Sequence, residues 1–277
     1  PGADDCIACD TVIATEDLQG GTSRNTGSDK QTYYRLSMSD REGDSPYAMA
    51  EALWGGGAVH GDIALAEALG SAEAFYRLVS LGVPFPMNEY GAFVGYKTDH
   101  DPRQRATSAG PLTSRLMFEA LAREAKRMRI PVFDRHPVVA LLTRGAGAGK
   151  SVIGAIALDA GRPRPKEGPA FVLFNAKNVV LGTGGPAGMY AASVYPETQT
   201  GGTGLALEIG AIANNLTESQ FGLASTAFRW NLSGTFQQVV PRYFSTDADG
   251  GDEREFLSDV FPDMERLATA IFLKGYQ

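Results

Sequence analysis

Hydrophobic and polar residues follow a helical period in two neighbouring stretches of the chain. Apolar residues recur three or four positions apart over residues 45–54 and again over residues 62–81, which predicts two amphipathic helices. Asp62 is the expected N-cap of the second helix, because its short polar side chain suits a hydrogen bond with the first helical turn. Gly82 is the expected stop, since glycine readily adopts the left-handed conformation that ends many helices.

Three further helices are expected along the chain. Residues 111–129 predict a long helix with a proline in its first turn and basic residues in its last turn, an arrangement that suits the helix dipole. Residues 201–213 open on the glycines of TGGTG and continue with an apolar period. Residues 258–272 form the last periodic stretch and predict a final helix.

Short apolar runs rich in β-branched residues predict strands between these helices. The first run is DTVIATE, residues 10–16, which ends in Glu16. Five more strands are expected over residues 132–133, 138–143, 152–158, 171–174 and 179–181. Residues 83–97 carry an Asn-Glu-Tyr-Gly turn between aromatic residues and predict a small hairpin. This alternation of helices and strands indicates an α/β fold.

The composition is typical of a globular protein. With 277 residues, 43% of them hydrophobic and 21% charged, the chain is long enough to bury a substantial core in one large domain or one and a half smaller ones. Its 33 glycines are an excess. They indicate tight turns, or places where the backbone approaches a ligand closely.

Charge and cysteine content exclude several classes of protein. A net charge of −7 with scattered Lys and Arg residues leaves no basic face, so no nucleic-acid partner is expected. No apolar stretch reaches the roughly 18 residues of a membrane span. The two cysteines, Cys6 and Cys9, exclude a secreted disulfide framework and favour a reducing, cytoplasmic compartment. No metal site is expected, because no second CxxC or His pair follows and DADGGDERE, residues 247–255, lacks the spacing of a calcium loop.

The sequence RGAGAGKS, residues 144–151, resembles a phosphate-binding Walker A loop. That motif requires Gly where this chain has Arg144, and it requires a helix after the lysine. Here Ser151 leads into VIGAIAL, which predicts a strand. The stretch is therefore expected to be the tip of a hairpin.

Two other features fit a dinucleotide. In a dinucleotide-binding βαβ unit the second strand ends in an acid whose carboxylate accepts hydrogen bonds from the ribose, and Glu16 ends its strand in this way. The glycine cluster GTGGPAG, residues 182–188, follows the apolar run NVVL. Pro186 removes one N–H donor, so this cluster is interpreted as a second approach of the backbone to a cofactor or as a tight turn after a strand.

Seven landmarks in one order over roughly residues 10–225 resemble the FAD-binding domain of the fumarate reductase and succinate dehydrogenase flavoprotein family. They are VIATED, GGTSRNTGSDK, YRLVSLGVPF, RATSAGPLTSRL, NVVLGTGGPAG, TGGTGLALEIGA and LTESQF. The resemblance implies an FAD/NAD(P)-binding Rossmann-like α/β domain over residues 1–222 and the start of an α+β capping domain over residues 223–277. It also implies that the first strand and its GxGxxG loop precede residue 10, so we expect poor FAD affinity from these residues alone.

The resemblance implies FAD as the cofactor and assigns residues to it. Glu16 matches the ribose acid, and Gly204 matches the last glycine of the family's TGDG, although Thr203 replaces its aspartate. The expected cofactor-binding residues are Glu16, Thr22, Ser23, Asn25, Gly27, Ser28, Thr183, Gly184, Gly185 and Gly204.

For chemistry, the resemblance implies hydride transfer between the flavin and a C–C bond beside a carboxylate or carbonyl. Guanidinium groups pair with carboxylates through two hydrogen bonds, which makes Arg105 and Arg242 candidates for substrate binding and proton exchange. His100 is a further catalytic candidate. Pro111 stands after Ala109 and Gly110 where the family has a His, so the substrate is left open between a fumarate-like dicarboxylate and the substrates of aspartate oxidase-like or ketosteroid dehydrogenase-like relatives.

The expected partners follow from the same resemblance. They are a small carboxylate-bearing substrate and an electron-transfer subunit. A structural alternative remains for each arginine, namely a surface or salt-bridged position, and a non-enzyme alternative is a fragment without activity of its own.

Overall fold

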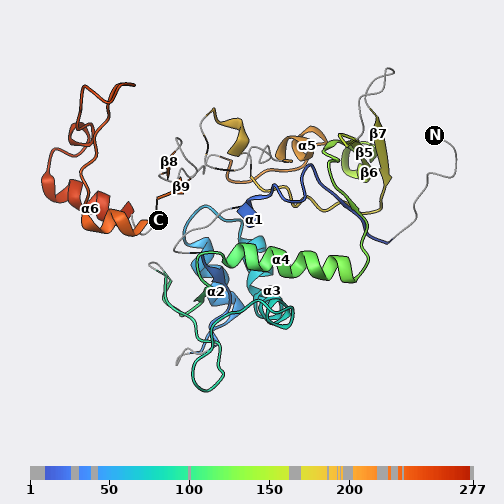
Figure 1. Ribbon diagram of the computed structural model, residues 1–277, viewed down its shortest axis with the longest axis horizontal. Helices are drawn as coiled ribbons and strands as arrows, with labels where there is room; N and C mark the ends of the chain where they lie inside the picture. The colour runs from blue at the N-terminus through green and yellow to red at the C-terminus, as the bar shows by residue number, and fades with distance from the viewer. Residues whose placement is uncertain are drawn as a thin grey trace.

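The computed structural model describes most of the chain. The described residues are 10–25, 31–38, 43–98, 101–161, 170–185, 187–191, 193, 195, 202–216, 224–225, 230–232 and 234–274. Three helices, α2, α3 and α4, lie together in one part of the molecule, and a small sheet of β5, β6 and β7 lies in another, with the C-terminal helix α6 at the far end (Figure 1).

Helix α2 (Pro46–Trp54) begins where the sequence predicts. Ser45 is its N-cap and accepts a hydrogen bond of 3.1 Å from the Ala48 N–H through Oγ, and Pro46 occupies the first turn, where its missing N–H costs nothing. The prediction of this helix is confirmed.

Helix α3 (Gly61–Ser80) is confirmed as a long helix, but the expected N-cap was wrong. His60 is the N-cap, and Asp62 lies inside the first turn, where its carboxylate still complements the positive end of the helix. Gly82 has φ of +89°, the left-handed conformation expected of it at the helix end.

An aromatic core lies between α3, α4 and the segment after α3. Phe75 is fully buried and packs with Phe85 at a ring distance of 4.9 Å. The Arg35 guanidinium lies 4.3 Å above the Phe75 ring and donates to the carbonyls of Leu36 and Phe93. Burial lowers the pKa of Arg35, and the surrounding aromatic faces and carbonyls compensate part of that cost.

Helix α4 (Thr113–Arg127) starts slightly later than predicted because the chain turns before it. The Thr113 hydroxyl donates to the Gly110 carbonyl at 2.6 Å and accepts the Ala109 N–H at 2.9 Å. The Gln31 side chain binds both the N–H and the hydroxyl of Ser114, which fixes the start of α4 against the N-terminal part of the chain.

Two small sheets carry most of the described strands. Strand β1 (Ile13–Ala14) pairs in parallel with β4 (Val132–Phe133). Strands β5 (Val138–Arg144), β6 (Ser151–Leu158) and β7 (Phe171–Asn175) form an antiparallel sheet in the order β5-β6-β7. Phe133 meets Phe174 edge to face at 5.1 Å, which joins the two sheets. Gly154 is required in β6, because a Cβ there would lie 2.0 Å from the Phe174 carbonyl oxygen.

Two strand predictions were wrong. Residues 83–97 form no hairpin: Asn88 organises a turn by accepting the N–H groups of Tyr90 and Ala92, but Tyr96 pairs with Ala106 instead of with the start of the segment. Residues 179–181 belong to no sheet among the described residues, and Val180 is 91% exposed. A strand requires a hydrogen-bonding neighbour, which an apolar run cannot show by itself.

Strand β3 (Ala106–Thr107) pairs with β2 (Tyr33–Tyr34) in an antiparallel bridge. A further pair consists of β8 (Ala224–Ser225) and β9 (Trp230–Asn231). A short helix, α1 (Thr22–Asn25), forms where only a loop was expected. The expected boundary between residues 222 and 223 lies outside the described residues.

The last two helices are shorter than predicted. Helix α5 (Thr203–Glu208) ends early because Gly210 takes φ of +91°. Helix α6 (Met264–Lys274) starts late because Pro262 interrupts the apolar period, and Asp263 Oδ1 accepts the N–H of Glu265 at 2.8 Å. No helix within the described ranges is both long enough and apolar enough to cross a bilayer.

Candidate functional site

Glu16 lies directly after β1, at the point where the chain leaves the parallel pair. The Thr15 N–H donates to the Phe133 carbonyl at 3.0 Å, and the Thr15 carbonyl accepts the His136 N–H at 2.7 Å, so the backbone is fixed up to the preceding residue. The Glu16 side chain is exposed, and no hydrogen bond among the described residues engages its carboxylate. It is available to accept hydrogen bonds from a ligand.

The loop after Glu16 is held in shape by its own polar groups. The Leu18 N–H donates to Asp134 Oδ1 at 2.8 Å, across 116 residues of sequence. The Asn25 amide donates to the carbonyls of Gln19 at 2.5 Å and Gly21 at 3.0 Å, so Asn25 shapes the loop with both donors occupied. A Cβ on Gly21 would meet no atom of the residues that the structure describes within 4 Å.

Of the other residues predicted for this loop, two lie within the described part of the chain. Thr22 and Ser23 lie in α1, and the Ser23 side chain is exposed. Gly27 and Ser28 lie outside the described residues. The sequence did not reveal that α1 packs on α4, because that contact joins segments far apart in the chain.

A second group of predicted residues lies where the glycine turn after residue 181 contacts the start of α5. Thr183 Oγ1 accepts the Gly202 N–H at 2.9 Å, and a Cβ on Gly202 would lie 2.6 Å from the same oxygen. Gly184 takes φ of +72°, a conformation that favours glycine. A Cβ on Gly204 would meet no atom of the described residues within 4 Å. The structure therefore places the predicted residue Thr183 against Gly202, two residues before the predicted Gly204.

Arg105 is buried in an ion cluster. Its side chain is 1% exposed, and it forms a two-pronged pair with Asp44, with Nε donating to Oδ2 at 2.8 Å and Nη2 to Oδ1 at 2.7 Å. Its Nη1 donates to Asp101 Oδ1 at 3.1 Å, and the Asp101 side chain is 4% exposed. This geometry corresponds to the salt-bridged alternative for Arg105.

The pKa values of the cluster reflect this pairing. Burial alone would raise the pKa of Asp44, but hydrogen bonds from Arg105 and from the N–H groups of Ser37 and Ser45 outweigh it and hold the pKa below its usual range. Burial alone would lower the pKa of Arg105, and the two aspartates outweigh it and raise the pKa. The pair of Asp44 and Arg105 therefore stays ionised throughout the physiological pH range.

The other two catalytic candidates lie elsewhere. Arg242 is 69% exposed and its Nε donates to Glu255 Oε1 beside the bridge between Ser245 and Arg254, in the segment before α6. His100 lies outside the described residues. No hydrogen bond or ion pair among the described residues joins Arg105 to Arg242.

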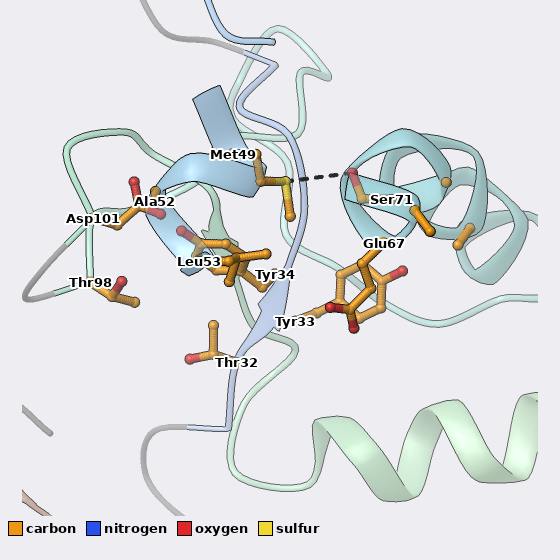
Figure 2. A pocket seen from close by; sticks show the side chains of 13 residues that line it. Thr32, Tyr33, Tyr34, Met49, Ala52, Leu53, Glu67, Ser71, Thr98 and Asp101 are labelled. Atoms are coloured by element: carbon orange, nitrogen blue, oxygen red, sulfur yellow. Dashed lines mark hydrogen bonds between the residues drawn. The ribbon is translucent and has the colours of Figure 1, made fainter. Parts of the chain in front are cut away.

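A groove of about 720 Å³ runs between α2, α3 and β2 (Figure 2). Ala66, Gly70 and Ala74 line it with small side chains at helical spacing, and Glu67 points into it from the same helix. Its lining contains none of the residues predicted for cofactor or substrate. Asp101 alone joins it to the Arg105 cluster. Sequence reasoning missed this groove, although the four-residue spacing of the small residues on α3 was a usable signal.

No three His, Cys, Asp or Glu residues gather to hold a metal ion within the described part of the chain. Sequence reasoning missed Asp44 and Asp101 as partners of Arg105. The spacing of Asp101 and Arg105, four residues apart, was a usable signal, whereas Asp44 lies 61 residues away.

Comparison with known proteins gives one family match. The sequence model of a family described as an FAD binding domain matches residues 10–242. No curated protein matches the chain.

Three solved structures share the fold. The Mycobacterium smegmatis Sdh1 complex in the apo form is 21% identical, with a TM-score of 0.66 over 94% of this chain and 44% of that one. The open conformation of a flavocytochrome c3 fumarate reductase is 19% identical, with a TM-score of 0.64 over 95% of this chain and 46% of that one. A 3-ketosteroid-delta4-(5alpha)-dehydrogenase from Rhodococcus jostii RHA1 is 17% identical, with a TM-score of 0.51 over 76% of this chain and 56% of that one. The chain therefore spans about half the length of these structures.

Proposed function

The chain belongs to the FAD-binding domain family, and on that premise we propose that it holds FAD for a flavin-dependent oxidation or reduction. The observation that carries the proposal is the family match over residues 10–242, which includes Glu16 at the end of a strand in a parallel pair. An acid in this place is the ribose-binding group of dinucleotide folds.

The described residues fit such a cofactor. The Glu16 carboxylate is exposed and faces no competing donor among the described residues. A Cβ on Gly21 or Gly204 would touch none of the described residues within 4 Å, so on this part of the chain space lies beside both backbone positions. Backbone without side chains beside open space allows the close approach that a pyrophosphate or an isoalloxazine edge requires.

Each segment has a distinct part in this proposal. Glu16 accepts hydrogen bonds from the ribose hydroxyls, and the loop that Asn25 holds in shape lies along the cofactor. The turn of Thr183, Gly184 and Gly185 approaches the cofactor from the start of α5, together with Gly204. Thr183 contributes indirectly as well, because its hydroxyl fixes the start of α5.

FAD supplies two-electron chemistry when bound, and the protein supplies binding, orientation and exclusion of water. We propose that Arg242 contacts the substrate. Its guanidinium is exposed and, among the described residues, pairs with one carboxylate, that of Glu255. Arg105 holds the Asp44 and Asp101 segments together and does not touch substrate. Residues 223–277 are proposed to begin a domain that closes over the site.

The substrate class is a molecule with a C–C bond beside a carboxylate or carbonyl. The similarity to a flavocytochrome c3 fumarate reductase and to a 3-ketosteroid-delta4-(5alpha)-dehydrogenase supports this class without choosing within it. Pro111 stands where the resembling dicarboxylate enzymes have a His, which favours keeping a ketone substrate as the second candidate. An electron-transfer partner subunit remains part of the proposal.

Flavin binding tests the proposal directly. The protein produced from its complete gene is titrated with FAD, and binding is followed by the change in flavin fluorescence. Glu16→Ala removes charge-assisted hydrogen bonds worth about 1.5–3 kcal/mol, so we expect affinity to fall at least tenfold. Glu73→Ala, which removes an exposed carboxylate from α3, is the matched control and leaves affinity unchanged. A wild-type protein that binds no FAD refutes the function, and equal affinity of Glu16→Ala refutes the role of Glu16.

A further inference from the structure

The glycine-rich stretch between β5 and β6 forms a compact tip. The Gly149 N–H donates to the Ala146 carbonyl at 3.2 Å and the Lys150 N–H to the Gly147 carbonyl at 3.1 Å. Gly145 has φ of +82°, and a Cβ there would lie 2.5 Å from the Gly149 carbonyl oxygen. The expected hairpin tip is confirmed, and its tightness fixes the backbone from which the Lys150 side chain extends.

Lys150 reaches out of the hairpin to another element. Its Nζ donates to the Ile209 carbonyl at 2.8 Å, across 59 residues of sequence. Ile209 is the C-cap of α5, where a helix leaves carbonyl groups without partners inside the helix. An ammonium group at this end both satisfies a carbonyl and complements the helix dipole.

The opposite end of α5 is held by the glycine turn. Thr183 Oγ1 accepts the N–H of Gly202, the residue that precedes the helix, at 2.9 Å. Helix α5 has only six residues, and a helix this short is not stable without tertiary contacts. Its position therefore depends on tertiary contacts, which include Lys150 at one end, Thr183 at the other and strand β5 beside it.

We infer that Lys150 is a positioning residue for the cofactor site. By holding the end of α5, it fixes Gly204 and the Thr183 turn, which approach FAD in the proposed function on which this inference rests. Lys150 itself does not touch the cofactor. Its ammonium group binds a protein carbonyl, so the Walker-like sequence has a use that requires no bound phosphate.

The test substitutes Lys150→Met, which keeps the length of the side chain and removes its charge. Lys150→Arg is the rescue variant, because a guanidinium still donates to the carbonyl. Lys126→Met is the matched control, since Lys126 is an exposed lysine in the last turn of a different helix, α4. All are made in the protein produced from its complete gene, and circular dichroism verifies that each variant folds.

Two measurements are made on each protein. Amide hydrogen exchange without FAD reports how firmly α5 is held, and fluorescence titration gives the FAD dissociation constant. A cation at an exposed helix end contributes about 0.3–1 kcal/mol, which converts to about a two- to fivefold effect. We expect Lys150→Met to exchange two- to fivefold faster in α5 and to bind FAD two- to fivefold more weakly, with Lys150→Arg and Lys126→Met close to wild type.

The other outcomes overturn the inference. If Lys150→Met matches wild type in both measurements, the contact with Ile209 positions nothing. If exchange in α5 rises while FAD affinity is unchanged, Lys150 stabilises α5 without serving the cofactor. If affinity falls while exchange is unchanged, the lysine acts by a route other than α5. A wild-type protein that binds no FAD refutes the proposed function itself, and only that result removes both.

Discussion

Replacing Arg105 by Met tests the ion cluster most directly. The change leaves the carboxylates of Asp44 and Asp101 buried together without their cation, because the two side chains are 1% and 4% exposed. Breaking a buried pair by removing one partner costs about 3–5 kcal/mol. We expect a loss of this size in the free energy of unfolding.

The assay is urea unfolding at pH 7, followed by circular dichroism. With a denaturant dependence of about 3 kcal/mol per molar urea, the expected loss lowers the midpoint by about 1–1.7 M. Arg115→Ala is the matched control. It removes the arginine from an exposed pair on α4, in which Arg115 Nε lies 2.9 Å from Glu119 Oε1, and such pairs contribute about 0.3–0.5 kcal/mol.

The reasoning is refuted if the free energies of unfolding of Arg105→Met and of the control variant differ by less than about 0.5 kcal/mol. That result would mean that water reaches the carboxylates, or that the two aspartates separate when the guanidinium is absent. A large loss in both variants would instead show that arginine substitutions on these elements disturb packing in general.

Two further predictions concern pH and glycine. The pKa of Asp44 is held below its usual value of about 3.9 in the folded protein. Its contribution to the free energy of unfolding is therefore fully present above about pH 3.9, and it is lost as pH falls through the lower pKa of the folded state. The difference in urea midpoint between wild type and Asp44→Asn should therefore stay constant from pH 7 to about pH 5 and shrink below about pH 4; a difference that grows on acidification would contradict it. Gly82→Ala should destabilise the protein by about 1–2 kcal/mol, because φ of Gly82 is +89°. Gly70→Ala within α3 should stabilise it by about 0.5–1 kcal/mol. Thermal unfolding measures both changes, and shifts of the same sign would refute the assignment of Gly82 to the helix end and of Gly70 to the helix interior.

The helices could be predicted because their signals are local. The apolar period of α2 and α3, the Ser45 cap and the Gly82 stop all lie within or beside the element that they define. The prediction failed at the start of α6, because the helix was expected from residue 258 although Pro262 interrupts the apolar period and the helix starts only at Met264. A local period does not show where the backbone can supply N–H groups.

The strands and the ion cluster depend on distant partners. The run over residues 179–181 has strand composition, yet its composition does not show whether a neighbour is present. Arg105 was predicted as a substrate-binding candidate from the family resemblance, with a salt-bridged position as the alternative. The sequence did not show its partner Asp44, which lies 61 residues earlier, beyond any spacing rule. The hairpin tip was predicted correctly from the strand after Ser151, whereas the contact of Lys150 with Ile209 has no counterpart in the motif.

The parallel pairing of β1 with β4 also constrains the order in which the chain folds. The contact between Leu18 and Asp134 that follows the pair closes a loop of 116 residues, so β1 cannot pair with β4 until the chain between them has been made. The antiparallel β5–β6 hairpin, in contrast, closes over a few residues. During synthesis we expect β1 to emerge before β4 and to pair with it late, which leaves the edge that β4 covers open to aggregation until β4 is made.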